Sequence, residues 1–307
     1  MVYKDTLVIS YTNYPSPYFI SVYGLNSKKL LGECYKQGRG PGEMNDCGLV
    51  IKNSQVFAYE PGIAVSEMDI DKLISLGGDY EPVVVHIPSS FRKSFAVYDD
   101  SILVGSNDFY LDGYERSKDI PALLKIDLRT GMLIPDEDMR DLDFFAGPVS
   151  GGQVVNFKES NQIMLALLKR PCMKIFDRDL NLVKTIVGPD KDDIEFAENV
   201  MDGFAFIEEK ENETSAFFID SYATGNEIFV LNDRAYKCTY DSMINEVAKS
   251  QEVWVFDMKG DIKRRYKIEN PESVIYSISY SAATQTLYAN SYDEDGETIF
   301  CRCVPVE

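Results

Sequence analysis

Apolar and polar residues alternate along the chain in short runs that are typical of β-strands. The runs hold five to seven β-branched, aromatic or aliphatic residues and are bounded by Asp, Asn, Gly and Ser. Helical periodicity is nearly absent, so the pattern predicts an all-β fold. The exception is Tyr240–Lys249, where Met243, Ile244 and Val247 follow a helical spacing. We expect a short helical insertion near residues 240–249.

A polar turn followed by a short apolar strand occurs six times along the chain. Successive copies lie about 50 to 60 residues apart, which is the spacing of a repeated supersecondary unit. The copies begin at Asp5, Asn53, Asp100, Asn161, Asn226 and Thr284.

A second recurring segment consists of two apolar strands that flank a tight polar turn. It occurs at residues 22–31, 125–134, 175–183 and 255–263, and residues 68–74 fit the same position less well. Asp, Asn and Gly suit such turns because they supply local hydrogen bonds and tolerate positive φ. One turn and strand, one hairpin and a further strand make a four-stranded antiparallel unit.

Six such units predict one domain over residues 1–307, a six-bladed β-propeller with four-stranded antiparallel blades. The expected blades lie near residues 1–44, 45–88, 89–140, 141–190, 191–270 and 271–307. The first unit lacks an obvious innermost strand before Asp5, and the last lacks an outer strand after Val304, so the strand that closes the ring is left open. Two all-β domains are the alternative architecture.

Charge and hydropathy narrow the possible partners. Lys and Arg number 31 and Asp and Glu number 50, so the formal net charge is 31 minus 50, or −19. This balance argues against nucleic acid and anionic membrane surfaces, which bind through clustered Lys and Arg. No run approaches the ~20 apolar residues of a transmembrane segment, and no signal peptide is visible at the start.

The inventory of reactive side chains is small. The only histidine, His86, lies in a strand-like run, where we expect a half-buried side chain; a single imidazole excludes most catalytic zinc sites. A Ser-His-Asp triad would need this residue, and no G-x-S-x-G motif is present. Six scattered cysteines show no metal spacing and are interpreted as buried or incidental thiols, with one disulfide as the alternative. The acidic segment 189–199 lacks the pattern of a calcium loop and is interpreted as a solvated connection, with a single helical turn as a possible local structure.

The segment Gln37-Gly-Arg-Gly-Pro-Gly-Glu-Met44 directly follows the first outer strand. It resembles the G-x-G-P-G-E-F signature of TolB-like or NHL-like six-bladed propellers of gut Bacteroidetes, whose function is unassigned, with Met44 in place of the aromatic residue. The resemblance implies a propeller fold and export, often with a lipid anchor upstream, and hence a periplasmic or cell-surface location. It implies no catalytic residues.

The same segment has a direct physical interpretation. Its three glycines permit conformations that side chains forbid, and Pro41 stiffens the turn. Glu43 is placed to fold back and accept backbone N–H groups. We interpret the segment as a structural turn between blades, with ligand contact by Arg39 or Glu43 as the alternative.

The up-and-down topology of a blade predicts which residues gather at one end of the ring. The loop between the second and third strands lies on the same face as the connection to the next blade. The second-to-third loops are expected to start near Asn13, Glu60, Asn107, Lys169, Asn232 and Ser291. From this face we select as candidate ligand-binding residues Arg39, Glu43, Asn107, Asp108, Tyr110, Arg170, Asn232, Asp233, Arg234 and Tyr292.

Amides, carboxylates, arginines and tyrosines around a concave centre suit a polar ligand. We therefore expect a non-catalytic binding or scaffold propeller, without a cofactor, for a small polar molecule, a glycan fragment or a partner protein. The alternative is a hydrolase or lyase that resembles lactonases and uses carboxylates or calcium, with Asp108, Asn232 and Asp233 as calcium ligands. A third possibility is a structural module whose insertion at 240–249 docks a partner chain.

Overall fold

The computed structural model of the protein describes most of the chain. The described residues are 1–12, 17–52, 55–60, 63–87, 91–99, 102–107, 123–134, 152–157, 161–168, 170–188, 196–201, 204–209, 214–236, 251–267, 275–292 and 298–303.

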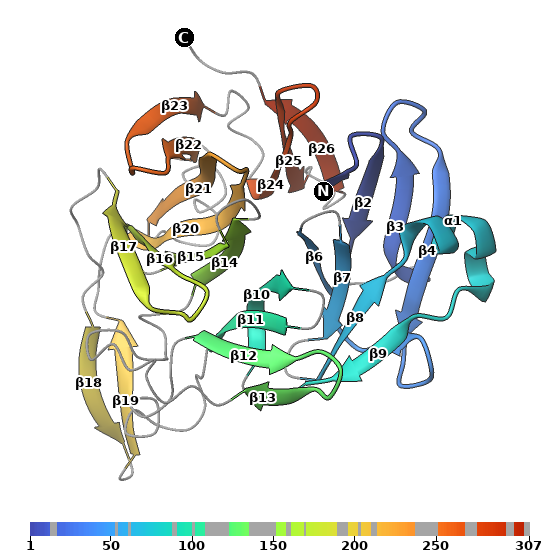
Figure 1. The fold of residues 1–307 in the computed structure, drawn as a ribbon, viewed down its shortest axis with the longest axis horizontal. Coiled ribbons are helices and arrows are strands. Elements are labelled where there is room, and N and C mark those ends of the chain that lie inside the picture. The colour runs from blue at the N-terminus through green and yellow to red at the C-terminus, as the bar shows by residue number, and fades with distance from the viewer. Residues whose placement is uncertain are drawn as a thin grey trace.

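Strands that pair with their neighbours in chain order build a series of sheets, arranged as blades around a common centre (Figure 1). The first sheet has five strands: β1 (Val2–Tyr3), β2 (Leu7–Tyr11), β3 (Tyr18–Gly24), β4 (Leu30–Gln37) and β5 (Glu43–Met44). All its pairings are antiparallel except that of β5, which lies parallel to β4.

Four further sheets each have four strands in antiparallel order. The second is formed by β6 (Gly48–Lys52), β7 (Gln55–Glu60), β8 (Ala64–Met68) and β9 (Val83–His86). The third is formed by β10 (Phe91–Asp99), β11 (Ile102–Asn107), β12 (Leu123–Asp127) and β13 (Met132–Ile134). The fourth is formed by β14 (Gly152–Phe157), β15 (Gln162–Leu167), β16 (Cys172–Phe176) and β17 (Leu182–Val187). The fifth is formed by β20 (Thr214–Ala223), β21 (Glu227–Tyr236), β22 (Glu252–Asp257) and β23 (Ile262–Lys267).

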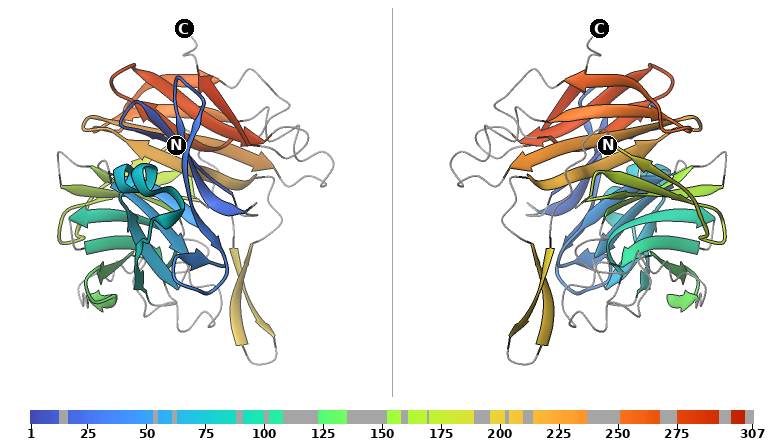
Figure 2. Two further views of the ribbon diagram at one scale, coloured as in Figure 1. Left: turned by 90° about the vertical axis from the view of Figure 1, so that its right-hand side faces the viewer. Right: turned by 90° about the vertical axis from the view of Figure 1, so that its left-hand side faces the viewer.

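The chain ends in a sheet of three strands, β24 (Ile275–Ser281), β25 (Thr286–Tyr292) and β26 (Thr298–Cys303). This C-terminal sheet lies between β20–β23 and β1–β5, with β24 in contact with both β20 and β1 (Figure 1). A separate hairpin, β18 (Phe196–Met201) and β19 (Phe204–Glu209), stands away from the ring (Figure 2).

The expectation of an all-β propeller is confirmed, and most blades have the expected four strands, but the expected number of six blades is wrong. The structure has five blades of four or five strands. The sixth repeat of the sequence does form β25, yet its sheet has three strands in the described residues. The acidic segment before blade five also differs in part from the expectation, because residues 196–201 form a strand rather than a helical turn.

The four hairpins expected around residues 22–31, 125–134, 175–183 and 255–263 are confirmed as β3–β4, β12–β13, β16–β17 and β22–β23. Residues 68–74 differ, because the connection from β8 to β9 contains helix α1 (Ile70–Leu76) and a 3-10 turn, η1 (Gly77–Asp79). The carboxylate of Asp69 caps this helix by accepting the N–H of Lys72 at 3.0 Å. The helical insertion expected at 240–249 lies outside the described residues.

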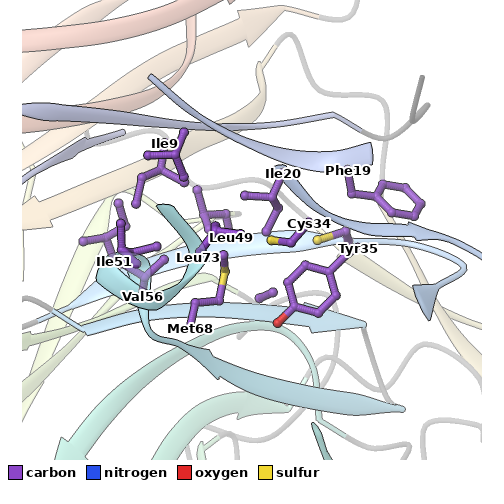
Figure 3. Packing of buried hydrophobic residues seen from close by; sticks show 14 of the residues in the cluster. Ile9, Phe19, Ile20, Cys34, Tyr35, Leu49, Ile51, Val56, Met68 and Leu73 are labelled. Atoms are coloured by element: carbon purple, nitrogen blue, oxygen red, sulfur yellow. The ribbon is translucent and has the colours of Figure 1, made fainter. Parts of the chain in front are cut away.

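Clusters of buried apolar side chains lie between successive blades. Between blades one and two, Ile9 and Ile20 pack against Leu49 and Val56, and Leu73 of α1 joins them (Figure 3). Similar clusters join blade two to three, three to four, four to five, and five to the C-terminal sheet.

The contact between the C-terminal sheet and blade one, which we call the closing seam, is different in kind. The N–H of Val2 donates to Ser279 Oγ at 3.3 Å, and the hydroxyl of Ser281 donates to the carboxylate of Asp5. None of the five apolar clusters in the described part of the chain crosses this seam. Polar contacts therefore complete the ring. The one described α-helix, α1, is too short to cross a membrane, and no other described helix could do so.

Candidate functional site

The antiparallel order of the strands divides the connections between the two ends of the ring. We call one end the loop face: strands β2, β7, β15 and β21 end there, and strands β3, β8, β16 and β22 begin there. The opposite end carries the tight hairpin turns and α1.

The glycine-rich link between β4 and β6 forms a closed turn on the loop face. The N–H of Gly40 donates to Glu43 Oε2 at 2.7 Å, as the sequence led us to expect, and the N–H of Gly38 donates to the carbonyl of Met44 at 3.0 Å. A Cβ on Gly40 would lie 2.9 Å from the same carboxylate oxygen, so the glycine leaves room for Glu43 to fold back. Arg39 is exposed at the tip of this turn.

Next to this link, a tyrosine reaches over the innermost strand of blade two. Tyr59 of β7 pairs with Gly48 of β6. The phenol ring of Tyr59 lies across the Gly48 backbone, and a Cβ on Gly48 would be 2.6 Å from the hydroxyl oxygen and closer still to the ring. The missing side chain at position 48 is therefore what allows Tyr59 to lie against this innermost strand.

Polar groups from other blades act electrostatically on Tyr59. Burial raises the pKa of the Tyr59 phenol, and Tyr11, Cys47, Asp46 and Asp220 raise it further in that order. Tyr11 ends β2 and Asp220 belongs to β20 in blade five, so these neighbours come from separate parts of the ring. Asp220 Oδ2 also accepts the N–H of Ile278 at 2.7 Å, which joins blade five to the C-terminal sheet.

A buried carboxylate lies beside Tyr59 in the sequence, at the end of β7. Glu60 is only 7% exposed, and its Oε1 accepts a hydrogen bond from Asn45 Nδ2 at 3.2 Å. Asp46 Oδ1 accepts the N–H of Cys47 at 2.8 Å and shapes the start of blade two. We call Tyr11, Asn45, Asp46, Tyr59, Glu60 and Asp220 the central cluster.

The ten residues chosen from the sequence fall into three groups. Arg39, Glu43, Arg170 and Asn232 have described side chains: Arg39 is exposed, Glu43 and Arg170 are half-buried, and Asn232 is 1% exposed within β21. Four others are placed by their backbone in strands β11, β21 and β25: Asn107, Asp233, Arg234 and Tyr292. Asp108 and Tyr110 lie outside the described residues.

Sequence reasoning named Glu60 only as the start of a loop and missed the rest of the central cluster. The available signal was Gly48, a glycine inside an apolar run, which indicates a close approach by another group. Tyr59 faces it only through the β6–β7 register, which the sequence does not specify.

The groups considered for catalysis lie elsewhere or are incomplete. His86 is in a strand, as expected, but it is exposed rather than half-buried and lies on β9, the outermost strand of blade two. Within the described ranges, no group of three or more His, Cys, Asp or Glu side chains is arranged to hold a metal ion. Of the three calcium ligands considered, Asn232 alone has a described side chain.

The five described cysteines are free thiols. Cys34 and Cys47 are buried in the cluster between blades one and two, and burial raises the pKa of both. Burial, with a smaller contribution from Cys301, raises the pKa of Cys303 to about 11. Such thiols are poor nucleophiles at neutral pH.

Comparison with known proteins supports the fold but identifies no activity. No protein-family model matches the chain, and no curated protein sequence matches it. A crystal structure of a member of the DUF4221 family from Bacteroides vulgatus superimposes with a TM-score of 0.59 at 11% identity, covering 97% of this chain and 92% of that one.

Two other solved structures align over similar lengths with lower scores. A protein of unknown function from Bacteroides caccae has a TM-score of 0.47 at 10% identity, covering 98% of this chain and 93% of that one. A streptogramin B lyase has a TM-score of 0.48 at 9% identity, covering 96% and 86%. At 11% identity, the superposition on the DUF4221 protein supports the propeller fold and nothing finer, and it does not identify a TolB-like or NHL-like family.

Proposed function

We propose that the protein is a non-catalytic binding propeller that holds a small polar ligand, such as a glycan fragment, on the loop face over the central cluster. The observation that carries this proposal is that Tyr11, Asp46 and Asp220, from separate segments of the ring, all act electrostatically on the buried Tyr59 phenol. Glu60 and Asn45 lie beside them in sequence and are joined by a hydrogen bond.

The chemistry of the central cluster suits a ligand that carries hydroxyl groups. Carboxylates accept hydrogen bonds from hydroxyls, and such charge-assisted bonds are worth about 1.5–3 kcal/mol each. Tyrosine supplies an apolar ring face together with a polar hydroxyl, as a sugar ring requires. The rim of the same face would be completed by the sequence candidates Arg39, Arg170, Asp233, Arg234 and Tyr292, with Asn107 on blade three.

A thermal-shift screen with neutral mono- and disaccharides tests the proposal. We expect at least one sugar to raise the melting temperature of the wild-type protein. Tyr59→Phe and Glu60→Gln should abolish this shift, because the first removes the hydroxyl and the second replaces a charged acceptor oxygen by an amide donor, while each keeps the side-chain shape. His86→Ala, on the outer strand, is the matched control and should leave the shift unchanged. A shift that survives both central variants would overturn the proposed site.

A carboxylate-dependent or calcium-dependent hydrolase or lyase is the second candidate, favoured by the acidic side chains Asp46, Glu60 and Asp220 near the centre of the ring. Turnover of a bound sugar, or a rise in melting temperature with calcium that Asp108→Ala or Asp233→Ala removes, would support it. Binding without turnover and without a response to divalent ions would exclude it in favour of the binding propeller.

We further propose that the protein works in the periplasm or at the cell surface. The G-x-G-P-G-E segment and the structural likeness to a Bacteroides protein support this location. Fractionation of cells that express the protein from its native gene tests it, and recovery only in the cytoplasmic fraction would contradict it.

A further inference from the structure

The C-terminal sheet ends at a strand with one open side. Each of the five blades has at least four strands, but in the described part of the chain β26 pairs with β25 alone. An edge strand presents a row of backbone N–H and C=O groups that can pair with another extended chain. The position that a fourth strand fills in the blades is therefore not filled here by any described strand.

Blades four and five show what a fourth strand does at such a position. The fourth strand of blade four is β17, and its Ile186 lies against the β22–β23 hairpin of blade five. A Cβ on Gly260 of that hairpin would be 3.0 Å from Ile186. Lys184 of β17 donates to the carbonyl oxygens of Met258 and Lys259 in the same hairpin. The fourth strand thus covers the turn of the next blade with one apolar and one polar contact.

The corresponding turn of blade one is the β3–β4 hairpin, and none of the described strands of the C-terminal sheet covers it as β17 covers β22–β23. Leu30, at the start of β4, is 49% exposed, and Leu25 in the turn is only partly buried. On the C-terminal sheet, Phe300 of β26 is partly buried and stacks on Tyr288, with ring centroids 5.0 Å apart. Apolar side chains therefore stand on both sides of the position that a fourth strand would occupy.

The register shows that these side chains face the closing seam. Ser279, Tyr288 and Arg302 stand opposite one another on β24, β25 and β26 and share one face of the sheet. Ser279 accepts the N–H of Val2, so this face is turned toward blade one. Phe300 is two residues from Arg302 on the same strand and lies on the same face.

Exposed cations lie on both elements that flank this position. Lys28 and Lys29 of the β3–β4 turn are exposed, as is Arg302 on β26. These three cations belong to a protein whose net charge is −19. Acidic side chains of a segment that approached this position would complement these three cations.

We propose that the open edge of β26 binds an extended acidic peptide segment of a partner protein by β-strand addition. The segment would pair with β26 as a fourth strand and place an apolar side chain over Leu30, as Ile186 is placed over Gly260. Its acidic side chains would lie near Lys29 and Arg302. Backbone hydrogen bonds provide affinity in this mode of recognition, and the side-chain contacts provide specificity. The site is on the rim of the ring and is independent of the proposed ligand site on the loop face.

A peptide derived from the protein itself tests the proposal. The probe is a fluorescent peptide of residues 180–188, which contain β17, carrying Lys184→Glu. We expect it to bind the full-length protein in an anisotropy titration and to slow hydrogen exchange in residues 298–303 by about tenfold. Leu30→Asp and Arg302→Glu should each weaken binding by about tenfold. The unsubstituted peptide should bind more weakly than the acidic one.

Matched variants separate this site from general effects. Leu182→Asp changes a leucine of similar exposure on β17, and Lys259→Glu changes an exposed lysine in the equivalent hairpin of blade five. Both should bind the probe as the wild type does. Amides of β26 that already exchange as slowly as those of β22 in the free protein would show that the chain covers its own edge, which overturns the proposal. A dimer that Leu30→Asp dissociates would assign the edge to a second copy and also overturn it.

Discussion

At the scale of single residues, the central cluster depends on a side chain that is absent. Tyr59 lies where it does because Gly48, its partner in the β6–β7 ladder, has no Cβ. The sequence showed a glycine in a strand, but the register between two strands decides which residue lies against it. By contrast, the bond between Glu43 and Gly40 was predictable, because both groups belong to one short turn.

Gly48→Ala should therefore destabilise the protein and displace Tyr59. The added Cβ would overlap the phenol ring, and overpacking of this kind costs about 1–3 kcal/mol. Urea unfolding measures the loss. Tyr59→Ala removes the ring. In that background, Gly48→Ala should therefore lower the free energy of unfolding much less than it does in the wild type. Equal costs with and without the ring would contradict the contact.

At the scale of elements, the hairpin turns were predictable because their chemistry is local. In β16–β17 and β22–β23, an aspartate at the end of the first strand, Asp177 or Asp257, accepts two backbone N–H groups of its own turn. Helix α1 was missed although Asp69, Ile70 and Leu73 carry a cap and a helical spacing. Because strand β8 precedes this segment, a hairpin was the expected continuation. The segment forms a helix instead, and this helix packs against β4 of blade one.

The Asp257 turn gives a prediction for the dependence of stability on pH. The N–H of Asp261, the ammonium of Lys263 and the N–H of Lys259 lower the pKa of Asp257 to about 2. Because this pKa lies below the unfolded value, the charged form stabilises the folded protein above about pH 4, and this contribution is lost as the pH falls toward 2.

Asp257→Asn keeps the acceptor and removes the charge. The difference in unfolding free energy between wild type and variant should shrink as the pH falls from 5 to 2, which denaturant titrations at several pH values measure. Asp261→Asn controls for the loss of one acidic group in the same turn and should show a weaker trend. A difference that stays constant over this range would contradict the assigned role.

At the scale of the whole molecule, the sequence repeats predicted the propeller but not its number of blades. Six copies of the turn and strand are present, yet the last belongs to a sheet of three strands. A repeat motif predicts one strand of a blade. Whether a sheet has four strands depends on other segments, which carry no such motif. The closing seam was also left open by the sequence, and the structure fills it with polar contacts of Val2 and Asp5.

The polar character of the closing seam predicts where the ring opens first. Blade four, β14–β17, has an apolar cluster on each side, whereas among the described residues the C-terminal sheet has one only toward blade five. Amides of β24 should therefore exchange with solvent through openings of lower free energy than those of β15. Native-state hydrogen exchange followed by mass spectrometry measures both strands in one experiment. Equal protection of the two would show that the seam is as stable as the apolar contacts between blades.

We propose that the loop face binds a polar ligand through the central cluster, in which the buried carboxylate of Glu60 is the group whose loss is easiest to isolate. Calorimetric titration of the wild type and Glu60→Gln with the best sugar from the screen tests it directly. Loss of one charge-assisted hydrogen bond should raise the dissociation constant by about tenfold or more, whereas the His86→Ala control should bind as the wild type does. Equal affinity of the wild type and Glu60→Gln would contradict the claim.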